Sequence, residues 1–137
     1  MIHFIYEDKR WDRRLEPLAE RAYVAAGMDG EVSLLLAGDV LVAKYNLEYR
    51  GKDCATNVLS FETGDRELPG DIILSYDTLS REAMEQGVAF EAHFAHLLLH
   101  GLLHLMGHDH QVEAEAEKME AKEIEILEKL GFGNPYI

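Results

Sequence analysis

Six of the seven histidines lie in one stretch, HFAHLLLHGLLHLMGHDH, which runs from His93 to His110. Histidine binds metals through a neutral ring nitrogen and is the commonest metal ligand in proteins. Three histidines that converge on one point can hold zinc and leave a fourth position open, as in catalytic zinc sites. The stretch therefore indicates metal chemistry, and helix geometry decides which histidines can share an ion.

Four of these histidines recur every fourth residue and so fall on one face of a helix: His96, His100, His104 and His108. Neighbours on that face are about 5.4 Å apart along the axis, whereas residues eight apart are separated by about 12 Å. Zn–N bonds of about 2.0–2.1 Å cannot span the longer separation. Only one adjacent pair can serve a given metal, and the third ligand must come from outside the straight helix.

Gly107 can end the helix and let the following residues turn back towards the preceding turn. His110 can then approach the metal held by His100 and His104, with the spacing H-x3-H-x5-H. Three neutral imidazoles buried together without a metal would be costly. We therefore predict one Zn²⁺ bound by His100, His104 and His110.

Other assignments of the same stretch remain open. His108 can replace His110 as the third ligand if the helix ends early, whereas the pair His96 and His100 has no third ligand nearby. His93 and His96 are more simply explained as hydrogen-bonded core residues. Asp109 is either an acceptor for a metal-bound histidine or a solvated turn residue.

Gly101 occupies the position that holds the general base in H-E-x-x-H metalloproteases. A helical glycine costs about 1 kcal/mol relative to alanine, so we expect it to make room for something close to the metal. A metal with three neutral ligands keeps its full charge and can stabilise the transition state of phosphodiester cleavage. The site therefore suits a phosphodiester better than a peptide.

The elements that must position these residues alternate between short strands and amphipathic helices. Asp12, Asp39 and Asp77 are the expected helix N-caps. The expected strands are 2–6, 31–37, 58–62 and 71–75, and the expected helices are 12–26, 39–49, 78–86, 90–106 and 112–130. We predict a single α+β domain over residues 1–137, with a mixed sheet of about four strands flanked by about five helices.

Composition limits the choice of cellular compartment and of binding partners. The single cysteine, Cys54, excludes an internal disulfide, and no signal peptide or membrane span is recognisable, so we expect a cytoplasmic protein. The net charge of −13 argues against DNA or RNA, because nucleic-acid-binding domains usually carry a basic face. Seven glutamates lie between Glu113 and Glu128, so positive potential can still exist elsewhere.

The segment HGLLHLMGHDH resembles the signature of the YbeY family of bacterial metal-dependent endoribonucleases. The resemblance extends over nearly the whole chain, through NL and YR at 46–50, TNVLSF at 56–61, GDI at 70–72 and the ending LGFGNPY. It implies a zincin-like fold, similar to matrix metalloproteases, and zinc ligands at His100, His104 and His110. It also implies an arginine important for activity at Arg50. Family members are linked to 3′-end maturation of small-subunit ribosomal RNA and to ribosome quality control.

The chemistry of Arg50 agrees with that role, because a guanidinium can hold a phosphate through two parallel hydrogen bonds. Lys52 and Arg66 can add phosphate contacts. To reconcile RNA with the acidic composition, we expect positive potential confined to a cleft near Arg50 and the metal, with the acidic last helix facing away. A ribosomal partner, the small subunit or one of its proteins, can supply further attraction.

Two other functions fit the same motifs. A metal-dependent protease or amidase needs a carboxylate, such as Glu91 or Asp71, within one water of the metal. A non-enzymatic ribosome-assembly factor would have a structural zinc with a closed set of four ligands, completed by Asp109 or His108.

Overall fold

A four-stranded sheet forms one layer of the computed structural model, which describes residues 1–65, 67–107 and 113–136. Its strands are β1 (Ile2–Tyr6), β2 (Val32–Ala37), β3 (Val58–Glu62) and β4 (Gly70–Ser75), in the order β1-β2-β4-β3. β1, β2 and β4 are parallel, and β3 pairs antiparallel with β4 as the edge strand. The predicted mixed sheet is confirmed, and β3 and β4 form its antiparallel pair.

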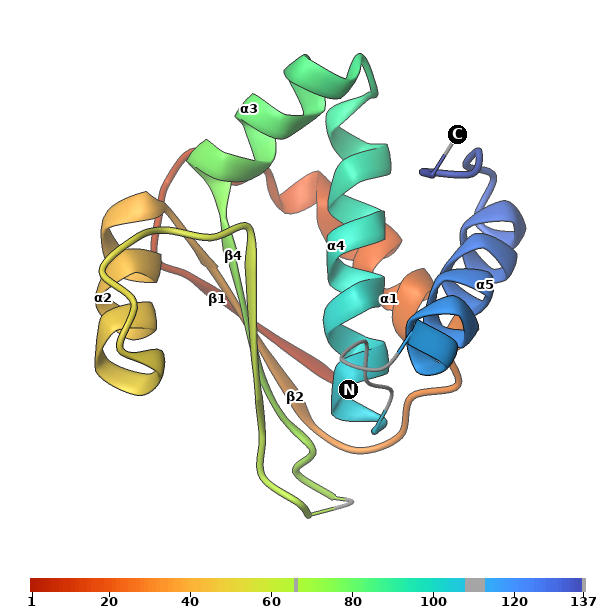
Figure 1. Cartoon of the computed structure of the whole chain (residues 1–137), viewed down its shortest axis with the longest axis horizontal. Helices are drawn as coiled ribbons and strands as arrows, with labels where there is room; N and C mark the ends of the chain where they lie inside the picture. The colour runs from red at the N-terminus through yellow and green to blue at the C-terminus, as the bar shows by residue number, and fades with distance from the viewer. Residues whose placement is uncertain (66, 108–112, 137) are drawn as a thin grey trace.

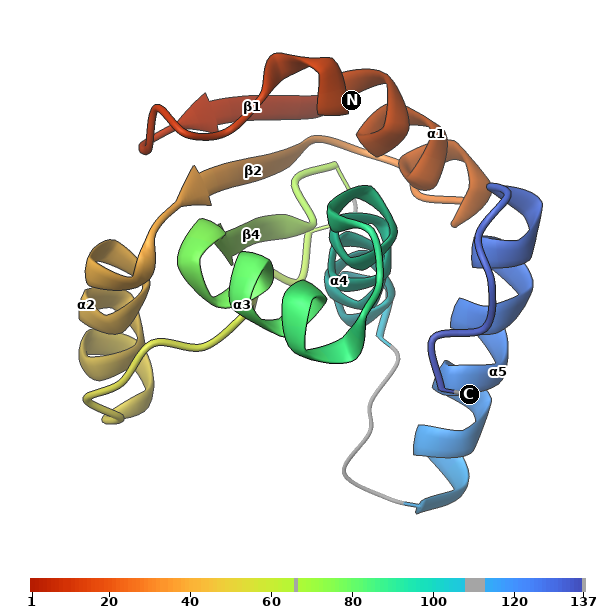
Figure 2. The same cartoon turned by 90° about the horizontal axis from the view of Figure 1, so that it is seen from above.

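Helices cover both faces of the sheet (Figure 1). They are α1 (Glu16–Ala25), α2 (Asp39–Arg50), α3 (Tyr76–Gln86), α4 (Phe90–Leu105) and α5 (Glu113–Lys129), with a short 3-10 helix, η1 (Arg13–Leu15), before α1. α2 lies alone on one side, and α4 packs on the other with α1 and α5 beside it (Figure 2). The predicted α+β class with five helices is confirmed.

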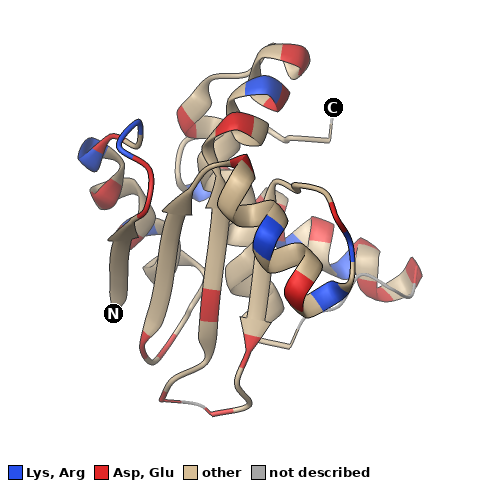
Figure 3. Cartoon of the chain, turned by 90° about the vertical axis from the view of Figure 1, so that its left-hand side faces the viewer, with Lys and Arg blue, Asp and Glu red and all other residues tan. Residues whose placement is uncertain are grey.

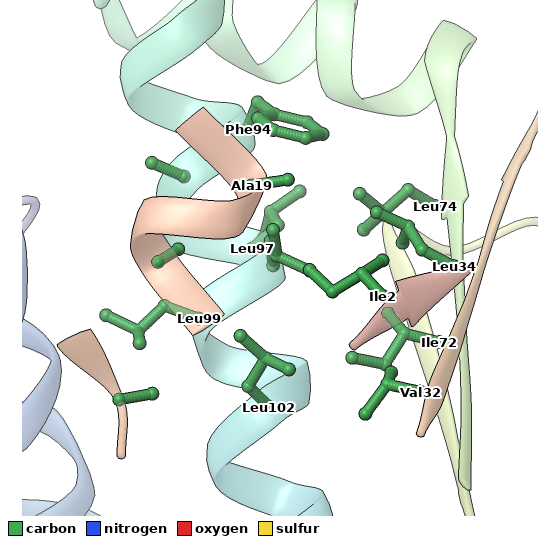
Figure 4. Packing of buried hydrophobic residues seen from close by; sticks show 14 of the residues in the cluster. Ile2, Ala19, Val32, Leu34, Ile72, Leu74, Phe94, Leu97, Leu99 and Leu102 are labelled. Atoms are coloured by element: carbon green, nitrogen blue, oxygen red, sulfur yellow. The ribbon is translucent and has the colours of Figure 1, made fainter. Parts of the chain in front are cut away.

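The main core lies between the sheet and α4. Leu34, Ile72 and Leu74 project from the strands towards Phe94 and Leu102 of the helix (Figure 4). A buried side chain of this size stabilises the fold by roughly 1.5–3 kcal/mol. The packing of these side chains against the sheet fixes the rotation of α4 and hence the direction of its histidines.

A smaller core cluster joins the opposite sheet face to α2. It contains Ala37, Val42, Leu59 and Ile73, with Tyr45 and Phe61 among the partly buried residues packed against it. Successive strand residues point to opposite faces. Residues of β3 and β4 therefore divide between the α2 side and the α4 side, which places Asp71 on the same face as Ile73.

The helix caps differ from those expected. Asp12 caps η1 instead of a longer α-helix. The backbone N-cap of α2 is Gly38, not Asp39, and that of α3 is Ser75, not Asp77. Asp77 instead caps the other helix, since its Oδ2 accepts the backbone N–H of Asp39 at 2.9 Å, whereas Asp39 Oδ1 accepts the side-chain hydroxyl of Thr78 at 2.6 Å.

No helix within the described ranges is both long enough and apolar enough to span a membrane.

Candidate metal centre

His100 and His104 lie side by side on α4, with ring centroids 4.8 Å apart and ring planes inclined at 72°. Both are half-buried, whereas the leucines between them, Leu102 and Leu103, have no exposed surface. The separation of four residues thus places the two rings together at the edge of the core, as predicted. Two imidazoles at this spacing can bind one metal ion.

The third predicted ligand, His110, lies outside the described residues, as do His108 and Asp109. Within residues 1–65, 67–107 and 113–136, no group of three or more histidine, cysteine or acidic side chains is arranged to hold a metal. The pair His100 and His104 is therefore the described part of the predicted triad, and the choice among third ligands stays a prediction.

A buried carboxylate from another helix holds His100. Oε1 of Glu123, on α5, lies 2.6 Å from Nδ1 of His100, and Glu123 has no exposed surface. Burial alone would raise the pKa of Glu123, but hydrogen bonds from His100, His96 and Tyr136 outweigh it and lower the pKa to about 2. Glu123 is thus a carboxylate at neutral pH, and Nδ1 of His100 is the donor.

Tyr136 covers the second oxygen of this carboxylate. Its hydroxyl donates to Oε2 of Glu123 and lies 3.2 Å from Nε2 of His96, which donates to it. Burial and the neighbouring Glu123 carboxylate raise the pKa of Tyr136 well above its usual range. The sequence ending NPY is therefore folded back against the histidine helix.

This donor set fits zinc. Ligating histidines usually donate their second ring N–H to a carboxylate or carbonyl, which fixes the tautomer and makes the other nitrogen more basic. In neutral His100, donation from Nδ1 leaves the lone pair on Nε2. The hydrogen bond between Glu123 and His100 has this usual arrangement.

The two histidines at the start of α4 have structural roles, as expected. His93 is buried, and its Nε2 lies 2.9 Å from Oε1 of Glu82, which also accepts a hydrogen bond from Asn57 at 3.1 Å. His96 contacts Tyr136 and Glu123.

Gly101 allows α4 to approach the sheet closely. A Cβ atom at this position would lie 3.1 Å from Cγ2 of Ile72 and 3.2 Å from the hydroxyl oxygen of Ser60. We expected the glycine to make room close to the metal, and the structure shows sheet side chains in that place. Its small size brings β3 next to His100 and His104.

Arg50 is the last residue of α2 and is exposed. Its Nη2 lies 3.5 Å from the carbonyl oxygen of Ser60, whose side chain faces Gly101. Ser60 thus connects the predicted phosphate-binding residue to the histidine helix. Lys52 is exposed in the following loop, and Arg66 lies outside the described residues.

The loop after Arg50 is held by Asn46. This buried side chain donates from Nδ2 to the carbonyl oxygen of Cys54 at 2.9 Å. The Gly51 residue ends α2 in the left-handed conformation (φ 69°), which turns the chain into the loop. Cys54 itself is a free, exposed cysteine.

Neither carboxylate proposed for peptide hydrolysis is near the pair of histidines. Glu91 lies on α4 nine residues before His100, which is about 14 Å along the helix axis. Asp71 lies on the α2 side of the sheet with Ile73, away from α4. The protease or amidase alternative therefore lacks its base among the residues named for it.

Glu123 and Tyr136 were not singled out by the sequence. A signal for Glu123 exists, because Met119, Glu123 and Leu127 are spaced by four residues and the two outer ones are apolar. A glutamate on the apolar stripe of a helix needs a partner inside the protein. Nothing in the sequence pattern identifies that partner as His100.

Comparison of the chain with known proteins agrees with these observations. The model of the family described as Endoribonuclease YbeY matches residues 5–131. The chain is 47% identical to an Endoribonuclease YbeY of Chelativorans sp. (89% of this chain, 83% of the relative). It is 44% identical to one of Parvibaculum lavamentivorans (91% and 76%). The solution structure of TM1509 from Thermotoga maritima superposes with a TM-score of 0.71 at 27% identity (95% and 89%). The chain belongs to the YbeY family, and its zincin-like α+β architecture is that of the family.

Proposed function

We propose that this protein is a zinc-dependent endoribonuclease that hydrolyses phosphodiester bonds in single-stranded RNA. The observation that carries the proposal is the pair His100 and His104, whose first member is held through Nδ1 by the buried Glu123 carboxylate. The family match supports the reaction, since the family and the relatives named above are called Endoribonuclease YbeY. Arg50, joined to the same region through Ser60, supports a phosphate-containing substrate.

Each residue has a defined task in this proposal. His100, His104 and His110 hold the metal, and Glu123 fixes the orientation of His100. Bound zinc supplies a Lewis acid and a water of lowered pKa. Arg50 binds the phosphate through its planar fork and neutralises charge that develops during cleavage. Gly101 stands where a metalloprotease has its glutamate base, so nothing in the motif favours peptide hydrolysis.

The cellular role is also part of the proposal. By resemblance to the family, the substrate is the 3′ end of the small-subunit ribosomal RNA precursor. The partner is the ribosomal small subunit or one of its proteins, and the compartment is the cytoplasm. Incubation with precursor small-subunit particles, followed by mapping of RNA ends, should show new ends at the mature 3′ position with the wild-type protein.

Metal analysis combined with cleavage assays tests the reaction. The wild type should contain about one zinc per chain and cleave single-stranded RNA but not peptides. His104→Ala should lose both metal and cleavage, whereas Arg50→Ala should keep the metal and lose cleavage by roughly a hundredfold or more. The matched control is His3→Ala, which removes a histidine of β1 that pairs with Glu31 outside the site. RNA cleavage that survives both loss of metal and loss of Arg50 would reject the mechanism.

A further inference from the structure

Three aromatic side chains form a cluster between α2 and the edge strand β3. The rings of Tyr45 and Tyr49, four residues apart on α2, are nearly parallel, with centroids 5.9 Å apart and planes inclined at 14°. Tyr49 also packs against Phe61 of β3, with centroids 5.4 Å apart and planes inclined at 60°. This aromatic cluster is not part of the candidate metal centre.

The inner and outer members of the cluster differ in exposure. Tyr45 and Phe61 are partly buried against the core cluster beneath α2. Tyr49 is 61% exposed, although tyrosine buries a large apolar surface when it packs in a core. The result is a ring supported from behind by two other rings and open to solvent on its remaining surface.

Basic side chains lie on both sides of this ring in the sequence of a protein that is strongly acidic as a whole. Figure 3 shows basic and acidic residues side by side along α2 and in the loop that follows it. Exposed Lys44 precedes Tyr45, and exposed Arg50 and Lys52 follow Tyr49. With Glu48 and Asp53, residues 40–57 carry three basic and two acidic side chains, a local charge of +1 against −13 for the chain. The charge of this segment is therefore less unfavourable to RNA than the charge of the chain as a whole.

Arg50 and Ser60 connect the aromatic cluster to the candidate metal centre. Arg50, adjacent to Tyr49, contacts the Ser60 carbonyl, and Ser60 is adjacent to Phe61. On the other sheet face the Ser60 hydroxyl lies against Gly101, between His100 and His104 in sequence. A strand of RNA that reaches the histidines over the β3 edge would pass Arg50 and the open tyrosine ring.

We propose that Tyr49, supported by Tyr45 and Phe61, stacks on an unpaired base of the RNA whose backbone phosphate Arg50 binds. The proposal rests on the endoribonuclease function and adds a base-binding site to it. Every base has a π face, so stacking on aromatic side chains binds single strands with little sequence preference. Paired bases inside a duplex offer no such face, so the site selects unpaired RNA.

A pair of oligonucleotides separates base stacking from phosphate binding. The first is a fluorescently labelled oligoadenylate of about eight nucleotides, and the second is an abasic strand of equal length. Affinities for the zinc-loaded full chain are measured by fluorescence anisotropy over a salt series. The readings are taken early, while gels show that the oligonucleotide is still uncleaved. Values of kcat and KM for RNA cleavage are measured in parallel.

Tyr49→Ala should weaken oligoadenylate binding by roughly five- to a hundredfold, the usual effect of removing one stacked base, and raise KM more than it changes kcat. Its affinity for the abasic strand should equal that of the wild type. Tyr49→Trp should restore binding. Arg50→Ala should weaken both oligonucleotides and reduce the salt slope by about one, whereas Tyr49→Ala should leave the slope unchanged.

Val40→Ala is the matched control, because Val40 is an apolar residue on the same helix and is 89% exposed. This variant should bind both strands as the wild type does. Zinc content and Tm verify that each variant is folded. Equal weakening of both strands by Tyr49→Ala, or no weakening, would overturn the stacking site while the proposed function stands. If Tyr49→Ala weakens the binding of neither strand, the exposed ring would be assigned to a protein partner instead. A wild type that neither binds nor cleaves RNA would overturn the proposed function and the stacking site with it.

Discussion

The Nδ1 atom of His100 lies 2.6 Å from Oε1 of Glu123, a carboxylate without exposed surface on a different helix. Burial of a charged group is costly unless hydrogen bonds compensate for it. Here His100 and Tyr136 donate to the two oxygens of Glu123. The relationship couples the packing of α5 and of the C-terminal residues to the orientation of one candidate metal ligand.

Replacement of Glu123 by glutamine should weaken zinc binding by roughly ten- to a hundredfold. The amide keeps the shape of the side chain but removes the charge that orients His100 and increases the basicity of its other ring nitrogen. Competition with a chelator of known affinity measures the change directly, without an activity assay. RNA cleavage at saturating zinc should recover much of its wild-type rate.

Glu117→Gln is the control for this variant, because Glu117 is an exposed glutamate on the same helix. It should bind zinc as the wild type does. If Glu123→Gln lowers the Tm of the metal-free protein but leaves zinc affinity unchanged, Glu123 stabilises the fold alone and does not position His100.

Local sequence patterns predicted much of this fold. β1 and β3 have the expected bounds, and the parallel β2 and β4 differ from the expectation by one residue each. The adjacent rings of His100 and His104 follow from helical spacing, which is a local property of the chain. Bulky buried residues such as Phe94 and Leu98 then determine which face of α4 the sheet covers.

Interactions between distant segments were not predictable in the same way. Glu123 lies 23 residues after His100, and Tyr136 lies 40 residues after His96, so no local period relates them. The prediction that Asp39 and Asp77 are N-caps of their own helices was wrong for the same reason, since each binds a residue of the other helix. Residues that a pattern marks as polar acquire their roles only when the fold supplies their partners.

Gly101→Ala should destabilise the protein by about 1 kcal/mol despite the higher helix propensity of alanine. The added Cβ would lie 3.1–3.2 Å from Ile72 and Ser60, and Ile72 is fully buried in the sheet and cannot move away. Overpacking of this kind costs roughly 1–3 kcal/mol, against a gain in propensity of about 1 kcal/mol. Urea unfolding of the metal-free protein measures the difference.

The double variant Gly101→Ala/Ile72→Val should recover part of the lost stability, because valine lacks the Cδ1 atom that lies 3.2 Å from the new methyl group. Gly133→Ala serves as the control, since a Cβ at Gly133 meets nothing within 4 Å. A Gly101→Ala variant that is more stable than the wild type would show that α4 can shift away from the sheet.

Asn46→Ala should release the loop that follows Arg50 and raise KM for RNA several-fold with a smaller effect on kcat. The change removes the hydrogen bond to the Cys54 carbonyl, whose net contribution is about 1 kcal/mol, and leaves a small cavity. Steady-state cleavage kinetics and urea unfolding measure the two effects. Cys54→Ala should change both less, because it keeps the backbone carbonyl and removes only the weaker contact of Asn46 Nδ2 with Cys54 Sγ at 3.8 Å. Unchanged KM in Asn46→Ala would mean that the loop keeps its position without this bond.

A charge network at the start of α2 and α3 predicts a contribution to stability that depends on pH. Arg10 donates to both oxygens of Asp77, at 2.5 and 2.9 Å, and also to Asp8. The hydrogen bond from Arg10, followed by that from the Asp39 N–H, lowers the pKa of Asp77 to about 2. A carboxyl group with a lower pKa in the folded state stabilises the protein above its unfolded pKa, near 4. That contribution is lost as the pH falls from about 4 towards 2.

Asp77→Asn should therefore reduce the free energy of unfolding at pH 7 by roughly 1 kcal/mol, a value kept small because a third of the Asp77 side chain is exposed. The difference from the wild type should shrink as the pH falls from 4 to 2, since protonation removes the same charge from wild-type Asp77. Urea unfolding at pH 7, 4 and 3 measures this convergence. Asp53→Asn, a change at an exposed aspartate in a loop, should show no such dependence. A deficit in Asp77→Asn that stays constant from pH 7 to pH 3 would show that its carboxylate stabilises α2 and α3 by packing instead of charge.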